Sequence, residues 1–229
     1  MIPQDVPRPA ALLFDFDGVL INSLPVMQLA FSAALQEVYP SKRMPHTALF
    51  KAYRTHLGMG FPQIMRNLDL SPDMFAPFRK HSRILAPYVR LYDDAIDLLD
   101  WAQSQGLPIG IATGKDYERT IELLDQLGIR HYFAAVYSSD NVPRPKPAPD
   151  MVQRFASETG IAISRILMIG DAAADIHCGQ AAGCPTAAAA WGYTERATLT
   201  ALRPTLIFDT PQDAQTQLQN LLLPEMLSK

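Results

Sequence analysis

The second part of the chain, from about residue 91 onward, alternates between amphipathic helices and short apolar strands. The predicted helices span 94–105, 116–127, 149–159, 173–182 and 211–222, and the predicted strands span 108–113, 133–137, 165–169, 186–190 and 205–208. Each of the first four helices is followed by a glycine, a common helix stop. Strands that alternate with helices form right-handed crossover units, so the pattern predicts an α/β fold with a parallel sheet and helices on both faces.

Residues 24–90 interrupt this alternation. Helical stretches are predicted there at 24–38, 47–56, 61–69 and 72–86, and no convincing strand is found. The apolar run at 10–14, which precedes them, has the length of a buried parallel strand. We therefore predict an α/β core formed by residues 1–23 and 91–229, with an all-helical domain at 24–90 inserted after the first strand.

Charge is distributed unevenly between these two regions. Residues 24–90 contain nine basic and three acidic residues, a net charge of +6, which leaves −9 for the rest of a chain whose net charge is −3. Such asymmetry indicates two units that meet at an anionic ligand; the alternative is a basic face that only contacts solvent. A nucleic-acid partner is disfavoured, because the basic residues are scattered and the whole chain is acidic.

Two aspartates follow the first predicted strand at a spacing of two. Side chains alternate along a strand, so Asp15 and Asp17 are expected on one side and Phe14 and Phe16 on the other. Two neighbouring carboxylates repel each other unless a cation or a shared proton compensates. Gly18 allows the backbone to turn sharply or to approach a ligand closely. The pair predicts a metal-dependent acid site at the carboxyl end of the strand; the alternative is a solvated turn.

Polar residues also follow the other predicted strands. They are Thr113-Gly114, Ser138-Ser139-Asp140 and Gly170-Asp171, and a loop with four prolines presents Lys146. In a parallel sheet all of them gather at one edge. Each has a simpler alternative: Thr113 as a helix cap, Lys146 as a solvated lysine, and Asp171 with Asp175 as a capped helix turn.

Together these residues match the requirements of phosphoryl transfer, which needs a nucleophile, a divalent ion and a proton donor for the leaving oxygen. Asp15 is the candidate nucleophile, and Asp17 the candidate general acid and base. Mg²⁺ prefers hard oxygen ligands, which we expect from Asp15, Asp17 and Asp171, with water completing the set. Asp175 lies one helical turn beyond Asp171 and is expected to support the metal site from behind.

The phosphoryl group itself needs donors for its equatorial oxygens. Thr113 and the backbone amide of Gly114 are expected to supply them, and Lys146 is expected to add positive charge next to the nucleophile. The expected partner of the chain is therefore a small phosphorylated metabolite.

Four of these segments, in this order, resemble the motifs of the haloacid dehalogenase (HAD) superfamily. They read Asp-Phe-Asp-Gly-Val-Leu, Ile-Ala-Thr-Gly, Arg-Pro-Lys-Pro and Gly-Asp-Ala-Ala-Ala-Asp, within residues 11–175. The resemblance implies a Rossmann-like core, Mg²⁺ as cofactor and an aspartyl-phosphate intermediate. An insertion directly after the first motif is similar to the subfamily with a helical cap, such as phosphoglycolate phosphatases. The short stretch between Thr113 and Lys146 leaves no room for a second cap.

A narrower likeness is carried by residues 21–27, 56–66 and 142–150, which resemble phosphatases associated with 3-amino-5-hydroxybenzoate synthesis. Asn22 departs from the Asp that many relatives carry. The likeness implies either an aminoshikimate-type substrate or phosphoglycolate. Alternatives are a phosphomutase of the same superfamily, a phosphonatase with a Schiff-base lysine at Lys42, Lys51 or Lys80, and a non-catalytic protein that binds phosphorylated metabolites.

Specificity is expected to come from the inserted helices. The segment 54–60 lies between two of them and contains Gly58 and Gly60, so we predict that it forms a loop lowered onto the substrate. Arg54 or His56 would then bind a carboxylate or hydroxyls of the leaving group. The alternative for His56 is a surface residue or a satisfied polar residue.

Composition limits where in the cell the protein is expected to work. Hydrophobic residues make up 48% and charged residues 19%, and no apolar run is long enough to cross a bilayer. The first residues lack the features of a signal peptide, and Cys178 and Cys184 match no metal or redox spacing. These features predict a cytoplasmic protein without a membrane partner, either a monomer or a homodimer.

Overall fold

A six-stranded parallel sheet forms the centre of the protein, whose computed structural model describes residues 6–41 and 44–222. The strands run in the order β5–β4–β1–β6–β7–β8. Their bounds are Ala11–Phe14 (β1), Ile109–Ala112 (β4), Ala135–Tyr137 (β5), Ile166–Gly170 (β6), Thr186–Ala189 (β7) and Leu206–Phe208 (β8). The predicted α/β class and the six strands of the sheet are confirmed. The buried backbone of each short apolar run forms its hydrogen bonds with the neighbouring strands.

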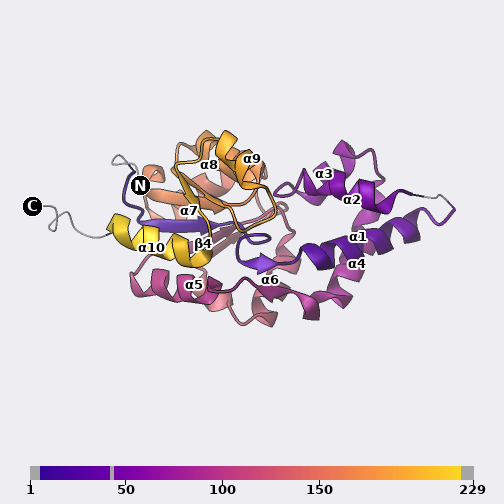
Figure 1. Cartoon of the computed structure of the whole chain (residues 1–229), viewed down its shortest axis with the longest axis horizontal. Helices are drawn as coiled ribbons and strands as arrows, with labels where there is room; N and C mark the ends of the chain where they lie inside the picture. The colour runs from indigo at the N-terminus through magenta and orange to yellow at the C-terminus, as the bar shows by residue number, and fades with distance from the viewer. Residues whose placement is uncertain (1–5, 42–43, 223–229) are drawn as a thin grey trace, which may run out of the picture.

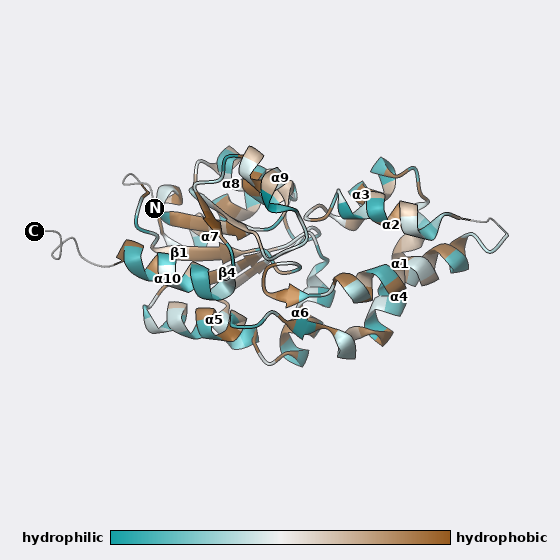
Figure 2. Cartoon of the chain, in the orientation of Figure 1, coloured by the Kyte–Doolittle hydropathy of each residue, from teal (hydrophilic) through white to brown (hydrophobic). Residues whose placement is uncertain are grey.

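Helices cover both faces of the sheet (Figure 1). One face carries α5 (Ala95–Ser104), α6 (Tyr117–Gln126) and α10 (Pro211–Leu222), and the other carries α7 (Asp150–Thr159), α8 (Ala173–Ala182) and α9 (Arg196–Ala201). Alternation along β1 separates the two cores, since Leu12 and Phe14 pack with the first set whereas Ala11 and Leu13 pack with the second. Figure 2 shows strands coloured as hydrophobic between helices in which hydrophobic and hydrophilic residues alternate.

A helical segment lies beyond the carboxyl ends of the strands (Figure 1). We use the name helical segment for its described residues 24–41 and 44–88. It comprises α1 (Leu24–Val38), α2 (His46–Arg54), α3 (Phe61–Asn67), η1 (Pro72–Met74), α4 (Phe75–Ile84) and η2 (Ala86–Tyr88). Most of its buried side chains, among them Phe31, Phe50 and Met74, form a cluster separate from the cores of the sheet, whereas Val26 and Ala86 pack with the first of those cores.

Two very short strands join the helical segment to the sheet. β2 (Ile21–Asn22) and β3 (Arg90–Leu91) pair antiparallel, with Ile21 opposite Leu91. The expectation that no strand occurs within 24–90 is therefore wrong at Arg90. Two residues are too few to produce a recognisable alternation, so the pairing becomes visible only when the two connections lie side by side.

The structure differs from the sequence-based elements in two further places. The helix predicted over 72–86 is divided into η1, α4 and η2, with Pro77 in the first turn of α4, where its missing N–H is tolerated. Helix α9 was not predicted. Residues 1–5 and the basic residues Lys42 and Arg43 lie outside the described residues.

Both cysteines, Cys178 and Cys184, are buried and unpaired, as expected for small apolar packing groups. None of the helices in the described ranges 6–41 and 44–222 is both long and apolar enough to span a bilayer.

Candidate active site

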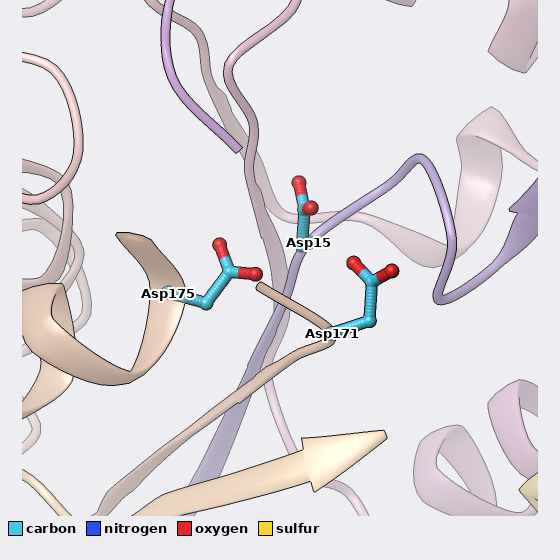
Figure 3. A group of neighbouring side chains, drawn as sticks. All are labelled: Asp15, Asp171 and Asp175. Atoms are coloured by element: carbon cyan, nitrogen blue, oxygen red, sulfur yellow. The ribbon is translucent and has the colours of Figure 1, made fainter. Parts of the chain in front are cut away.

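Three carboxyl groups meet at the carboxyl edge of the sheet. Asp15 follows β1, Asp171 follows the adjacent strand β6, and Asp175 lies in the first turn of α8. Their ligand atoms lie within 4.8 Å of one another, and all three residues are buried. Figure 3 shows the three carboxyl groups pointing toward a common space. We call these three residues the acid cluster; they converge because neighbouring parallel strands end at the same edge.

Lys146 supplies positive charge to the acid cluster from the proline-rich loop. Its Nζ lies 3.0 Å from Asp15 Oδ1, bonds to Asp175 Oδ1, and donates to the carbonyl of Ala112 at 2.7 Å. Burial by itself would lower the pKa of Lys146, but the carboxylates of Asp15 and Asp175 raise it above its ordinary value. The side chain is fully buried, which rules out a solvated loop lysine.

The charge of the acid cluster is only partly compensated. Burial, together with the neighbouring carboxylates, raises the pKa of Asp15 to about 7, although Lys146 acts in the opposite direction. Burial also raises the pKa of Asp171, with Asp15 and Asp175 adding to the effect. Asp15 Oδ1 is buried and forms the ion pair with Lys146 at 3.0 Å. Three buried carboxylates beside one ammonium leave negative charge that fits a divalent cation with oxygen ligands such as Mg²⁺.

Asp17 lies outside the acid cluster, so its expected place among the metal ligands stays a prediction. Its Oδ1 accepts a hydrogen bond from the hydroxyl of Ser23, and its Oδ2 lies 3.0 Å from Nζ of Lys115. Both oxygens are therefore occupied by partners that fix the orientation of the carboxyl group. Asp17 lines the same cavity as Asp15, where it can exchange a proton with a bound molecule.

Asp175 belongs to the acid cluster, and its expected role in supporting the metal site stays a prediction. Both of its oxygens already have protein partners, because Oδ1 accepts from Lys146 and Oδ2 accepts from the backbone N–H of Ala172 at 2.9 Å. Asp175 thus orients Lys146 and closes the first turn of α8 while lying within reach of a cation.

Asp171 is oriented by a residue that the sequence did not single out. The backbone N–H of Tyr193 donates to Asp171 Oδ2 at 2.6 Å, and the Tyr193 hydroxyl accepts from the N–H of Ser23 at 2.8 Å. Gly18 leaves room for this carboxyl group: its φ is +83°, and a Cβ there would lie 2.3 Å from Asp171 Oδ2. No local pattern marks Tyr193, because it lies in the loop after β7, which carries no motif.

Thr113 and Gly114 follow β4 and line the cavity beside the acid cluster. The Thr113 hydroxyl accepts from the N–H of Lys115 at 3.2 Å, and the N-cap of α6 is Asp116, so Thr113 is not a helix cap. A Cβ on Gly114 would lie 2.5 Å from the carbonyl oxygen of Met59. The absence of a side chain therefore allows the helical segment to approach this strand end closely.

A cavity of about 810 Å³ lies between the sheet edge and the helical segment. From the sheet it is lined by the expected residues Asp15, Asp17, Thr113, Gly114 and Lys146. From the helical segment it is lined by the loop after α2 and by side chains of α1, α3 and α4.

Arg54 and His56 do not line this cavity, so the expectation that they contact the substrate stays a prediction. The Arg54 guanidinium donates to the carbonyl of Tyr193 at 3.2 Å, and the His56 ring pairs with the Asn67 amide at 3.3 Å. The turn that ends α2 directs both side chains to these partners. The loop predicted over 54–60 does line the cavity, but through Leu57 to Gly60.

The chain belongs to the haloacid dehalogenase-like hydrolase family, whose model matches residues 12–189. It is 28% identical over 224 residues to the phosphoglycolate phosphatase of Neisseria meningitidis, covering 91% of this chain and 93% of that protein. It is 30% identical to the phosphoglycolate phosphatase of Neisseria gonorrhoeae over 80% of each chain. A hydrolase from Pseudomonas syringae has the same fold, with a TM-score of 0.81, 19% identity, and coverage of 92% and 98%. These matches make the protein a phosphatase of this family.

Proposed function

We propose that this phosphatase hydrolyses a small-molecule phosphate monoester with the help of Mg²⁺, through an aspartyl phosphate on Asp15. The observation that carries the proposal is the buried acid cluster with Lys146, of which Asp15 and Lys146 line a cavity large enough for a metabolite. Burying three carboxylates beside a single lysine costs stability, so a purely structural role does not explain the cluster.

In the first step, a carboxylate oxygen of Asp15 attacks phosphorus and the bond from phosphorus to the ester oxygen breaks. The leaving alkoxide takes a proton from Asp17, which lies two residues from Asp15 on the same cavity wall. In the second step, Asp17 accepts a proton from a water molecule that attacks the phosphoaspartate. Asp15 is thereby regenerated and inorganic phosphate is released.

Three groups of the protein are proposed to hold the phosphoryl oxygens. The Thr113 hydroxyl and the Gly114 N–H donate hydrogen bonds, and Lys146 provides charge beside Asp15. A Mg²⁺ ion bound by Asp15 and Asp171, with Asp175 nearby, would neutralise negative charge on the phosphoryl group. Lys146 holds Asp15 in place for in-line attack, and the buried setting strengthens each of these interactions.

Residues 24–90 are proposed to form the cap domain over a core of residues 1–23 and 91–229. Support comes from the separate hydrophobic cluster of the helical segment and from the two connections that pair as β2 and β3. A cap in this position excludes bulk water from the acyl phosphate until the alcohol has left.

The substrate is proposed to be either phosphoglycolate, named for the relatives in Neisseria, or an aminoshikimate-type phosphate of 3-amino-5-hydroxybenzoate synthesis. A panel of phosphate monoesters with Mg²⁺ tests both candidates. Transfer of phosphate between hydroxyls of one sugar, without release of inorganic phosphate, would indicate a phosphomutase instead.

The mechanism is tested by removing the metal and the nucleophile. We expect EDTA to abolish phosphate release and Mg²⁺ to restore it, and we expect Asp15→Asn to be inactive in both conditions. Rapid acid quench with a ³²P-labelled ester should leave label on the wild-type protein only. Full activity without divalent ions, or label on Asp15→Asn, would refute the proposal.

A further inference from the structure

The two walls of the cavity have different chemistry. The sheet edge contributes charged and hydroxyl side chains, among them Asp15, Asp17 and Lys146. The opposite wall, from the helical segment, is rich in aromatic and aliphatic groups. Its aromatic members, which we call the aromatic ceiling, are Tyr53, Phe61, Phe75 and Phe78.

The aromatic ceiling is held in place by contacts among its own rings. Phe61 and Phe78 stack with their centroids 4.7 Å apart and an interplanar angle of 27°. Phe75 packs against Phe61 at 5.6 Å, and Tyr53 packs against Phe78 at 6.2 Å. Such preformed rings bind apolar surface without having to be ordered first.

The size of the cavity exceeds what a two-carbon leaving group needs. At about 810 Å³ it lies in the upper part of the range, about 300–1,000 Å³, that encloses drug-sized ligands. A phosphoryl group held by Lys146 and Thr113 would leave glycolate near the charged wall and the half-buried rings of Phe75 and Phe78 in contact with water, whereas Tyr53 and Phe61 are already buried behind them. That wall gains free energy only when apolar surface covers it.

Arg79, next to the ceiling on α4, offers an unused donor. Its Nε is buried and has no hydrogen-bond partner among the described residues. The same guanidinium is anchored through Nη2, which lies 3.4 Å from Asp116 and pairs with Glu118, and its Cζ lies 6.0 Å from the centroid of Phe75. A buried unpaired donor is costly, and an acceptor on a bound ligand would relieve that cost.

We propose that the alcohol released by this phosphatase carries a ring-sized apolar body that packs on the aromatic ceiling, and an anionic group that Arg79 binds. The inference rests on the proposed phosphatase function and narrows its substrate class. It favours ring-bearing phosphate esters over phosphoglycolate, and it makes Arg79 a specificity-determining residue.

Neighbouring cations are less suited to this role. Arg66 also lines the cavity, but it is exposed and donates to Gln63 at 2.7 Å. Arg119 is buried with its guanidinium bonded to Ser82 and Glu122. Among the cavity-lining arginines of the described ranges, Arg79 is the one with a buried donor left unpaired.

The first experiment varies the leaving group. In every compound the phosphate is bonded to an alkyl carbon, so that the leaving groups are all alcohols. We would compare kcat/KM with Mg²⁺ for ethyl phosphate, phosphoglycolate, benzyl phosphate and 3-carboxybenzyl phosphate. We expect benzyl phosphate to exceed ethyl phosphate about tenfold or more, and the carboxylated ring to exceed benzyl phosphate by a similar factor. Phosphoglycolate or ethyl phosphate as the best ester would overturn the inference and leave the phosphatase function intact. Absence of hydrolysis with every ester would refute the proposed function itself.

The second experiment uses two arginines of the same helix. Arg79 and Arg83 both lie on α4 and both pair with Glu118, but Arg83 does not line the cavity. We expect Arg79→Met to reduce the preference for 3-carboxybenzyl over benzyl phosphate about tenfold, mainly through KM, and Arg79→Lys to restore part of it. Arg83→Met should keep the wild-type preference. An equal loss for both esters in Arg79→Met, or the same change of preference in Arg83→Met, would overturn the role of Arg79.

Discussion

The sheet edge and the helical segment form two walls of one cavity, and the two walls differ in polarity. The edge places buried ionisable groups in contact, with Lys146 between Asp15 and Asp175, whereas the facing wall is made of stacked rings such as Phe61 and Phe78. Charged groups bind and activate the part of a substrate that all phosphate esters share. Apolar groups distinguish the part that differs. The comparison therefore separates reaction chemistry from substrate choice.

The largest effect is expected at the sheet edge, from loss of the nucleophile. Asp15→Asn keeps the size of the side chain but removes the attacking carboxylate, so kcat should fall by about 10⁴-fold or more for every ester. Phosphate release under saturating substrate measures this. Asp125→Asn, a charge change on an exposed residue far from the cavity, is the matched control. A loss restricted to ring-bearing esters would contradict the division between the two walls.

Lys146→Met tests whether the sheet edge is also a stability element. Removing the lysine leaves the buried carboxylates of Asp15 and Asp175 without their partner, which should lower the free energy of unfolding by about 3–5 kcal/mol. Urea denaturation gives this value, and Lys51→Met, at an exposed lysine, should leave it unchanged. A stability equal to that of the wild type would mean that the acid cluster does not depend on Lys146.

Gly114→Ala tests the contact between the two regions. The added Cβ would lie 2.5 Å from the Met59 carbonyl oxygen and 2.7 Å from that of Gly58, so the helical segment should be displaced from the strand end. We expect kcat/KM to fall about 10- to 100-fold, since small misplacements of a closing element are costly. The urea midpoint should change little. Unchanged kinetics would show that this close contact is not required for turnover.

The smallest effect is expected from the exposed ion pairs between α4 and α6. Hydrogen bonds from Arg83 and Arg119 lower the pKa of Glu122, and those from Arg79 and Arg83 lower the pKa of Glu118, both below the ordinary 4.5. A lowered pKa in the folded state means that the stabilisation is present above pH 4.5 and is lost as the pH falls through the lowered value. The difference in urea midpoint between wild type and Arg83→Met should therefore shrink between about pH 7 and about pH 3. A constant difference would contradict this role of the ion pairs.

Prediction from sequence succeeded where the information is local. The helices α1 and α8 begin and end where their patterns predict, and α10 begins where its pattern predicts, since caps, prolines and glycines act within a few residues. The helix predicted over 72–86 and the strand β3 show the limit, because a broken helix and a two-residue strand depend on distant partners.

The sequence by itself determined that Asp15, Thr113 and Asp171 lie at one edge of the sheet, because parallel strands bring their carboxyl ends to one edge whatever the rest of the chain does. Only the tertiary structure decided which residues face them. The docking of the helical segment turned Arg54 and His56 toward other partners, brought the Tyr193 loop to Asp171, and left the Nε of Arg79 unpaired. Such contacts join residues far apart in the chain, and no periodicity or spacing encodes them.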